Sequence, residues 1–400
     1  MAEGIALFLL LFFALGLGWA LARWQFRRER RREERVSNHY FRGLNYLLNE
    51  EPDKAIDIFL ELAERKSNGG PSRRRHINHE VIDTHLALGS LFRRRGEMDK
   101  AIRFHKHIIA QPNLTEEQRT QALKALGRDY LKAGLLDRAE RLFSQLVERQ
   151  PGDNQPAQQL LDIYQQEKDW PQAIEQAQHL HAEAPDQTGA LLAQFYCELA
   201  EQALRQNDAA QAQKALRQAR RYQSDHPRAH IVAGHMAQSN DEPDKAIAHF
   251  QQACEKDPQS FVLISEHLMA CHQNQGTLQA LQAWLEQFVD LNSLSSATIM
   301  LANLRARSDV DEGVSVLVKG LENHPTIRGL EALVDLLAQH GRTLASVDPG
   351  MIGQLMARLR EAQPRYRCKE CGYSSSQHHW CCPSCRQWGS TRLVAGPWGD

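Results

Sequence analysis

The chain has 400 residues, of which 42 % are hydrophobic and 24 % are charged, which excludes a wholly disordered, collagen-like or polytopic membrane protein. The 48 basic residues nearly balance the 49 acidic ones, so the net charge of −1 predicts no overall attraction to nucleic acid or anionic lipid. Eight cysteines are too few for a disulfide scaffold of this length, and five of them lie between positions 368 and 385. Their clustering is therefore more informative than their number.

The first 22 residues predict a transmembrane anchor. Nineteen residues without a charge run from Gly4 to Ala22, and as a helix they would span about 28 Å, close to the bilayer core of about 30 Å. Seven arginines follow in residues 23–35, so the positive-inside rule places the N-terminus outside and the rest in a reducing cytosol. A cleaved signal peptide is the alternative, but its basic residues would precede the apolar stretch.

The juxtamembrane segment, residues 23–35, is the most basic part of the chain. We interpret it as a stop that fixes the topology and contacts lipid headgroups. A docking surface for another membrane protein is an alternative that these residues leave open. The basic residues are Arg23, Arg27, Arg28, Arg30, Arg31, Arg32 and Arg35.

Residues 36–325 predict tetratricopeptide repeats. In one unit Gly127, Tyr130, Ala139, Phe143 and Pro151 follow the repeat pattern. Gly or Ala lets the two helices of a hairpin cross closely, with a large aromatic residue beside it. Since one hairpin cannot bury its own apolar face, the hairpins should stack into an all-α superhelix with a concave groove. A non-repetitive bundle is the alternative. The aligned position recurs at residues 127, 161, 200, 234 and 268, at spacings of 34, 39, 34 and 34.

Other parts of the helical region follow the repeat pattern less closely. In an earlier unit we place Phe104 in the aromatic slot. Residues 67–80 are polar and contain Gly and Pro, which predicts an exposed insertion rather than a helix. Helical periodicity continues over 295–325 without the repeat signature, and residues 326–363 are expected to form terminal helices.

The helical region contains no motif for catalysis, so we do not expect an enzyme. It has no phosphate-binding loop, nucleophile elbow or dinucleotide fingerprint. Residues 76–80 read His-x-x-His-Glu, which is not the order of a zinc protease motif. Cys197, Cys254 and Cys271 lie beside Leu and Ala on helices and are expected to be small buried residues.

Residues 364–400 predict a small metal-binding domain. Cys368, Cys371, Cys382 and Cys385 form two Cys-x-x-Cys pairs with ten residues between them. Each pair curls the backbone so that two thiolates point at one centre, which suits a single tetrahedral cation, iron or zinc. Cys381 has no assigned role. A segment this small needs the metal for much of its folding free energy.

Three functions are open for this domain. The pairs resemble the two knuckles of rubredoxin, an iron protein, although the gap between them is much shorter, so redox activity is one alternative. A zinc ribbon that binds nucleic acid is a second, but the basic excess here is modest and has no accompanying aromatic stripe. We favour the third, a structural or partner-docking module.

The order of anchor, arginine-rich segment, repeats and Cys module resembles lipopolysaccharide assembly protein B of Gram-negative bacteria. The resemblance implies a single-pass bacterial inner-membrane adaptor, with a periplasmic N-terminus and a cytoplasmic bulk. It implies that the adaptor presents LpxC, an enzyme of lipid A synthesis, to the membrane protease FtsH, and contacts other lipopolysaccharide assembly or regulatory proteins of that membrane. It also matches the four predicted metal ligands one by one. We expect no nucleic-acid partner, and a homo-oligomer is possible. A general repeat scaffold or a redox protein is the alternative.

Overall fold

The computed structural model describes residues 74–111, 114–182, 185–341 and 363–400, together with a few isolated positions. Of the predicted anchor and juxtamembrane segment, Trp19 and Arg23 are described, and the rest lies outside the described residues. Within the described part of the chain, no helix combines the length and the apolar character needed to cross a membrane.

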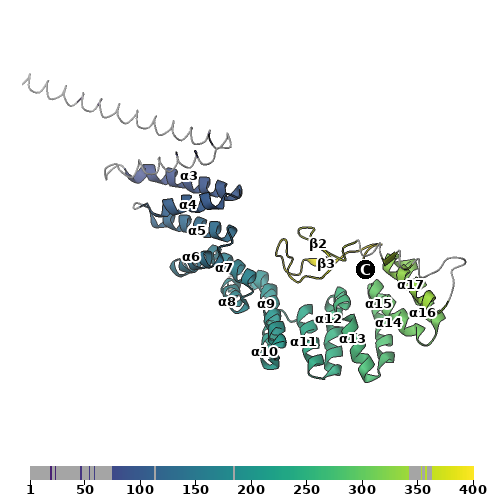
Figure 1. Cartoon of the computed structure of the whole chain (residues 1–400). Helices are drawn as coiled ribbons and strands as arrows, with labels where there is room; N and C mark the ends of the chain where they lie inside the picture. Colours follow the sequence, from purple (N-terminus) through teal and green to yellow (C-terminus); the bar gives the residue numbers. More distant parts are fainter. Residues whose placement is uncertain are drawn as a thin grey trace, which may run out of the picture. The chain divides into compact units, whose positions relative to one another are not determined.

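The chain divides into two compact units, residues 1–163 and 164–400, and both are built from antiparallel helix pairs (Figure 1). The described helices up to the boundary are α3 (Arg74–Arg94), α4 (Met98–Ile109), α5 (Glu116–Lys132), α6 (Leu136–Arg149) and α7 (Asn154–Glu167), which runs across it. The second unit continues with α8 (Trp170–His181), α9 (Pro185–Arg205), α10 (Ala209–Tyr222), α11 (Pro227–Ser239), α12 (Pro243–Lys256), α13 (Phe261–Gln275), α14 (Leu278–Asn292), α15 (Ser295–Ala306), α16 (Val310–Asn323) and α17 (Ile327–Gln339).

The small residue of the repeat lies where the helices of a hairpin cross, as the pattern predicts. A Cβ atom added to Gly127 would lie 2.6 Å from Cζ of Phe143, and one added to Gly234 would lie 2.4 Å from Cε1 of Phe250. Both phenylalanines are fully buried. The close approach of α5 to α6 and of α11 to α12 therefore depends on the absence of a side chain at these two positions.

The α3–α4 hairpin departs from the prediction in two ways. First, residues 74–80, predicted to be loop, form the start of α3, since the Gly and Pro of that segment all precede Arg74. Second, the aromatic slot opposite Gly89 holds His105 rather than Phe104, because a Cβ there would lie 2.3 Å from Nε2 of His105. Phe104 and His105 are adjacent aromatic residues, so the sequence pattern alone did not show which of them lies opposite the glycine.

A buried carboxylate connects this hairpin to the next one. Asp129 of α5 is fully buried; it accepts a hydrogen bond from Arg93 Nη1 (2.7 Å), and its other oxygen lies against Nδ1 of His105. The contact pairs an acidic group with donors from both helices of the neighbouring hairpin. Stacking of adjacent repeats in the first unit is therefore polar as well as apolar.

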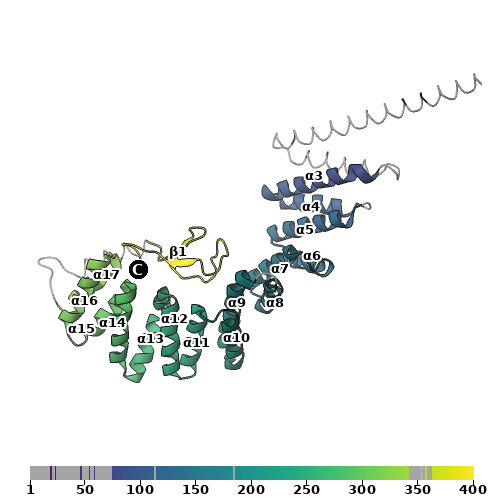
Figure 2. The ribbon, with the colours of Figure 1, turned by 180° about the vertical axis from the view of Figure 1, so that it is seen from behind.

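Residues 364–400, the metal module, form a small β-structure on the helices of the second unit (Figures 1 and 2). Strands β1 (Tyr366–Cys368), β2 (Ser374–Ser375) and β3 (Thr391–Leu393) make an antiparallel sheet in the order β2-β1-β3. In the described part of the chain, the fold is thus helical repeats with one short β-sheet at the Cys pairs, and the all-α prediction did not include this sheet.

Candidate metal centre

The first Cys-x-x-Cys pair is held in a tight main-chain turn. The N–H of Gly372 donates to the carbonyl of Cys368 (3.0 Å), and the N–H of Cys368 donates to the carbonyl of Tyr373 (2.8 Å). Gly372 has φ of +74°, in the left-handed region that glycine adopts without strain. Gly372 therefore allows the first turn to close without backbone strain.

The second pair repeats the same turn. The N–H of Arg386 donates to the carbonyl of Cys382 (2.8 Å), and the N–H of Cys382 donates to the carbonyl of Gln387 (3.0 Å). Arg386 takes the left-handed position here, with φ of +61°. The two turns therefore present their sulfurs in equivalent ways, although only the first carries a glycine.

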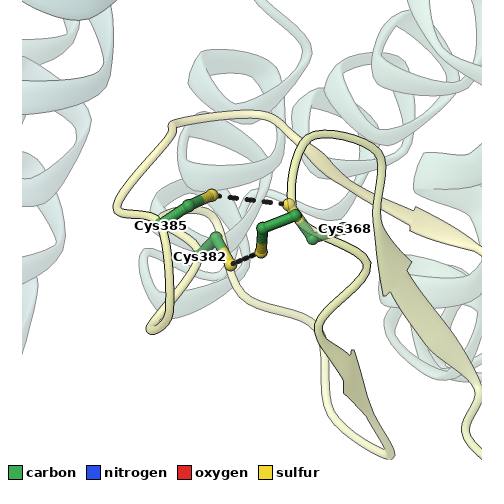
Figure 3. A group of neighbouring side chains, drawn as sticks. Cys368, Cys382 and Cys385 are labelled. Atoms are coloured by element: carbon green, nitrogen blue, oxygen red, sulfur yellow. Dashed lines mark hydrogen bonds between the residues drawn. The ribbon is translucent and has the colours of Figure 1, made fainter.

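The four sulfur atoms converge on one point (Figure 3). Sγ of Cys368 lies 3.6 Å from Sγ of Cys385, Sγ of Cys371 lies 3.7 Å from Sγ of Cys382, and all four lie within 4.8 Å of one another. A tetrahedral site with metal–sulfur bonds of about 2.3 Å places its sulfurs about 3.8 Å apart. The donor set and its spacing thus fit one soft cation such as zinc or iron.

Ionisation of these thiols depends on the cation. The Ser390 hydroxyl, 3.3 Å from the sulfur, and the N–H of Cys371 lower the pKa of Cys368 to about 6. The N–H of Gln387 acts in the same direction on Cys385, but burial and the neighbouring thiols outweigh it and raise the pKa of Cys385 to about 12. Four sulfurs this close cannot all be negative unless a positive ion compensates them.

The remaining cysteines take no part in this cluster. Cys381 Sγ lies 3.4 Å from the carbonyl oxygen of Arg386, and burial raises the pKa of its thiol to about 11. Cys197, Cys254 and Cys271 are buried among the helices, as predicted. Burial raises the pKa of Cys197 to about 12, so this thiol is protonated at neutral pH.

Two tryptophans of the metal module dock it onto the helices of the second unit. Trp388 donates from Nε1 to Oε1 of Gln165 (2.8 Å), and its ring meets those of Trp170 and Phe195 at centroid distances of 6.1 and 5.7 Å. Trp380 packs against the apolar core around α11–α15. The module therefore shares its aromatic surface with the repeats.

A buried arginine lies beneath these two rings. Arg228 of α11 is 1 % exposed, and its guanidinium carbon lies 5.1 Å from the ring centre of Trp380 and 5.9 Å from that of Trp388. It donates to Glu198 (2.7 Å) and to Glu201 (2.9 and 3.0 Å) of α9. The charge is thus compensated by two carboxylates while the flat group lies against the aromatic rings.

A second contact fixes the far end of the module. The side-chain carboxylate of Asp400 is fully buried; it accepts from the N–H of Ser296 near the start of α15 (2.7 Å) and from Nη1 of Arg328 in α17 (2.8 Å). The N–H of Ile327 donates to the carbonyl of Pro397 (2.8 Å). Asp400 therefore compensates the positive end of α15 and joins it to α17.

The sequence predicted the four cysteines but none of these docking residues. Arg228 carries no motif, and its role follows only from its burial next to Glu198 and Glu201. Trp388 and Gln165 are 223 positions apart, and no periodicity connects them. The three tryptophans in a segment with few other apolar residues were the signal that the module needs a surface to cover them.

Comparison with known proteins identifies both parts of the chain. Profiles of the tetratricopeptide repeat match residues 84–119, 124–188 and 197–261, and a profile of the rubredoxin metal binding domain matches residues 366–392. The repeats and the four clustered thiols therefore define a helical-repeat protein that carries a rubredoxin-like metal module.

Two curated relatives match along nearly the whole chain. Lipopolysaccharide assembly protein B of Escherichia coli is 34 % identical over 98 % of each chain, and that of Haemophilus influenzae is 30 % identical over 97 % of this chain and 98 % of its own. The chain belongs to the lipopolysaccharide assembly protein B family.

Solved structures offer a weaker likeness. MamA from residue 41 onward, from Desulfovibrio magneticus, covers 44 % of this chain and 95 % of its own at 18 % identity and a TM-score of 0.31. A tetratricopeptide repeat protein from Parabacteroides merdae covers 64 % and 98 % at 13 % identity and a TM-score of 0.33. At these scores the likeness adds nothing to the assignment.

Proposed function

We propose that the chain is a membrane-anchored adaptor of lipopolysaccharide assembly, acting by binding rather than by catalysis. The observation that carries the proposal is the full-length similarity to proteins named for that process. In its finer form, residues 1–22 hold the chain in the bacterial inner membrane with the repeats in the cytoplasm. There the chain brings the protease FtsH together with its substrate LpxC, alongside other lipopolysaccharide assembly proteins.

The metal module has a structural part in this proposal. Cys368, Cys371, Cys382 and Cys385 hold one zinc or iron ion, which supplies a cross-link between the two Cys turns. The turns carry Trp380 and Trp388, which cover Arg228 and so fix the surface of the neighbouring repeats. A redox role is not needed for any of these contacts. The metal thus maintains a docking surface for protein partners.

A complementation experiment tests the proposal. The full chain is expressed in a Gram-negative host depleted of its own relative, and the half-life of LpxC and its co-purification with FtsH are measured. The matched control lacks residues 1–22 and keeps every described helix. We expect the full chain to restore LpxC turnover and the control to fail, because only the anchored form is concentrated beside a membrane protease.

Two results would contradict parts of the proposal. If the full chain restores normal lipopolysaccharide levels while LpxC turnover stays unchanged, the adaptor acts on another client. If the form without residues 1–22 restores turnover equally well, the anchor is not required. Failure of both forms, with the protein present at normal levels and carrying its metal, would remove the proposed function altogether.

A further inference from the structure

A second concave site lies between the metal module and the repeats, apart from the four thiols. It is a cavity of about 470 Å³, within the range of small-ligand sites. One wall comes from α9, α11 and the segment around Asp257, and the other from the module. Neither part of the chain forms this cavity alone.

Four polar atoms of the lining residues are buried and have no hydrogen-bond partner among the residues that the structure describes. They are Oε1 of Gln223, Nδ1 of His226, Oγ1 of Thr391 and Nε of Arg392. His226 and Thr391 are each 5 % exposed, so bulk water does not reach them freely. A buried polar group without a partner is costly, which indicates that the cavity is built to hold something polar.

The unpaired atoms define what that ligand must offer. Oε1 of Gln223 only accepts and Nε of Arg392 only donates, while the Thr391 hydroxyl can do both. Burial, together with Arg228 and His230, lowers the pKa of His226 to about 4, so its ring is neutral at pH 7 and also offers either a donor or an acceptor. The ligand must therefore both donate and accept hydrogen bonds.

The cavity has no uncompensated charge. Its charged lining residues are Arg392 and Asp257, and they pair with each other at 2.6 Å. The rest of the lining is uncharged, and its large aromatic rings are those of Tyr366, Trp380 and Trp388. An ionic ligand would find no counter-ion here, whereas an uncharged ligand with an apolar face would cover the rings.

We propose that this cavity binds an uncharged sugar ring. A pyranose presents hydroxyl groups that donate and accept in several directions and a C–H face that packs on aromatic rings, so it meets each requirement at once. An N-acetylated hexosamine adds an uncharged amide that matches Gln223. An extended peptide offers donors and acceptors but has no comparable face for the ring wall. The inference goes beyond the proposed function and does not depend on it.

Binding is measured on the purified full chain in detergent with its metal bound. N-acetylglucosamine is titrated while tryptophan fluorescence and saturation-transfer NMR are recorded, and we expect a dissociation constant of about 1 mM. Glucosamine, which is cationic at pH 7, and glucose 6-phosphate are expected to bind at least about tenfold more weakly. Since the assay uses no client or protease, its outcome is separate from that of the complementation experiment.

Two variants of lining residues and one control variant test whether the signal comes from binding in the cavity. Leu263→Trp fills it from the α13 side and should abolish binding, whereas the matched control Leu291→Trp, at a site 83 % exposed on α14, should leave binding unchanged. If Leu263→Trp fails to fold, Gln223→Leu removes one acceptor and should weaken binding about threefold to tenfold.

Three results would overturn the inference. The first is the lack of a saturable response to N-acetylglucosamine up to about 20 mM, with ordered water alone in the cavity of a crystal structure. The second is equal binding of the charged sugars. The third is a peptide segment seated in the cavity of that structure with no response to any sugar.

Discussion

The helical repeats and the metal module solve the problem of stability in different ways. The repeats bury a long series of apolar side chains, and at close helix crossings a glycine lies against the ring of His105, Phe143 or Phe250. In the module the buried hydrophobic side chains among the described residues are Tyr366, Cys368 and Cys382, and two of these three are thiols of the metal cluster. The module has almost no apolar core, so its fold depends on the metal and on its contacts with the repeats.

This difference in stabilisation determines how far the effect of a substitution extends in each region. A change inside one repeat affects its hairpin and its immediate neighbours, because each repeat contacts only those beside it. Substitution of a metal-binding cysteine removes the metal site, on which the whole module depends for its fold. The two regions should therefore respond differently to substitution.

The largest expected effect is the loss of two metal ligands, which should unfold the metal module and leave the repeats folded. In Cys382→Ser/Cys385→Ser two of four ligands are lost, and the metal-dependent folding free energy of such modules is roughly 10–16 kcal/mol. We expect metal content to fall from one per chain to none and the module to unfold, while circular dichroism keeps the helical signal of the repeats. Metal analysis with Cys381→Ser as control, which should retain one metal, checks this.

Removing the buried arginine should undock the module without removing its metal. Arg228→Leu leaves Glu198 and Glu201, whose side chains are 20 % and 30 % exposed, without their cation, and the loss should cost about 1.5–3 kcal/mol. Hydrogen exchange of the module should accelerate while metal content is unchanged. The control is Arg305→Leu. Arg305 also pairs with two glutamates, but its side chain is 29 % exposed, so this substitution should lower the free energy of unfolding by less than about 1 kcal/mol. Equal effects of the two variants would contradict the role of burial.

A methyl group at a helix crossing tests the repeats. In Gly127→Ala the new Cβ would lie 2.6 Å from Phe143, and relieving that contact should lower the free energy of unfolding by about 1–3 kcal/mol. Gly152→Ala adds the same atom in open space and should change it by less than about 0.5 kcal/mol. Denaturant unfolding of both variants makes the comparison, and metal content should be unaffected in each.

The smallest effect concerns acid stability of the repeats. Burial, with His267 nearby, lowers the pKa of His235 to about 4 from its ordinary 6.5. Above pH 6.5 both folded and unfolded forms are neutral; as the pH falls toward 4, only the unfolded form gains the proton, so stability decreases. His235→Leu should reduce the loss of unfolding free energy between pH 7 and 4 by about 1–2 kcal/mol.

The sequence predicted what is local and periodic. The recurring small residue placed Gly127 and Gly234 at helix crossings, and the spacing of the four cysteines placed their sulfurs together. Where two aromatic residues are adjacent, as at Phe104 and His105, the pattern was wrong by one position. Arg228 and Asp400 could not be predicted because their roles depend on partners far away in the chain, and neither belongs to a repeating pattern.

The contact between Trp388 and Gln165 has a consequence for the order of folding during synthesis. Its two residues are 223 positions apart, so every helix from α8 to α17 leaves the ribosome before the bond can form. Repeats can fold one on the next as they emerge, whereas Trp388 can pack only after the repeats that form its contact surface have folded. Because that surface comes from repeats that have already stacked, the module can dock only after the array of repeats has folded.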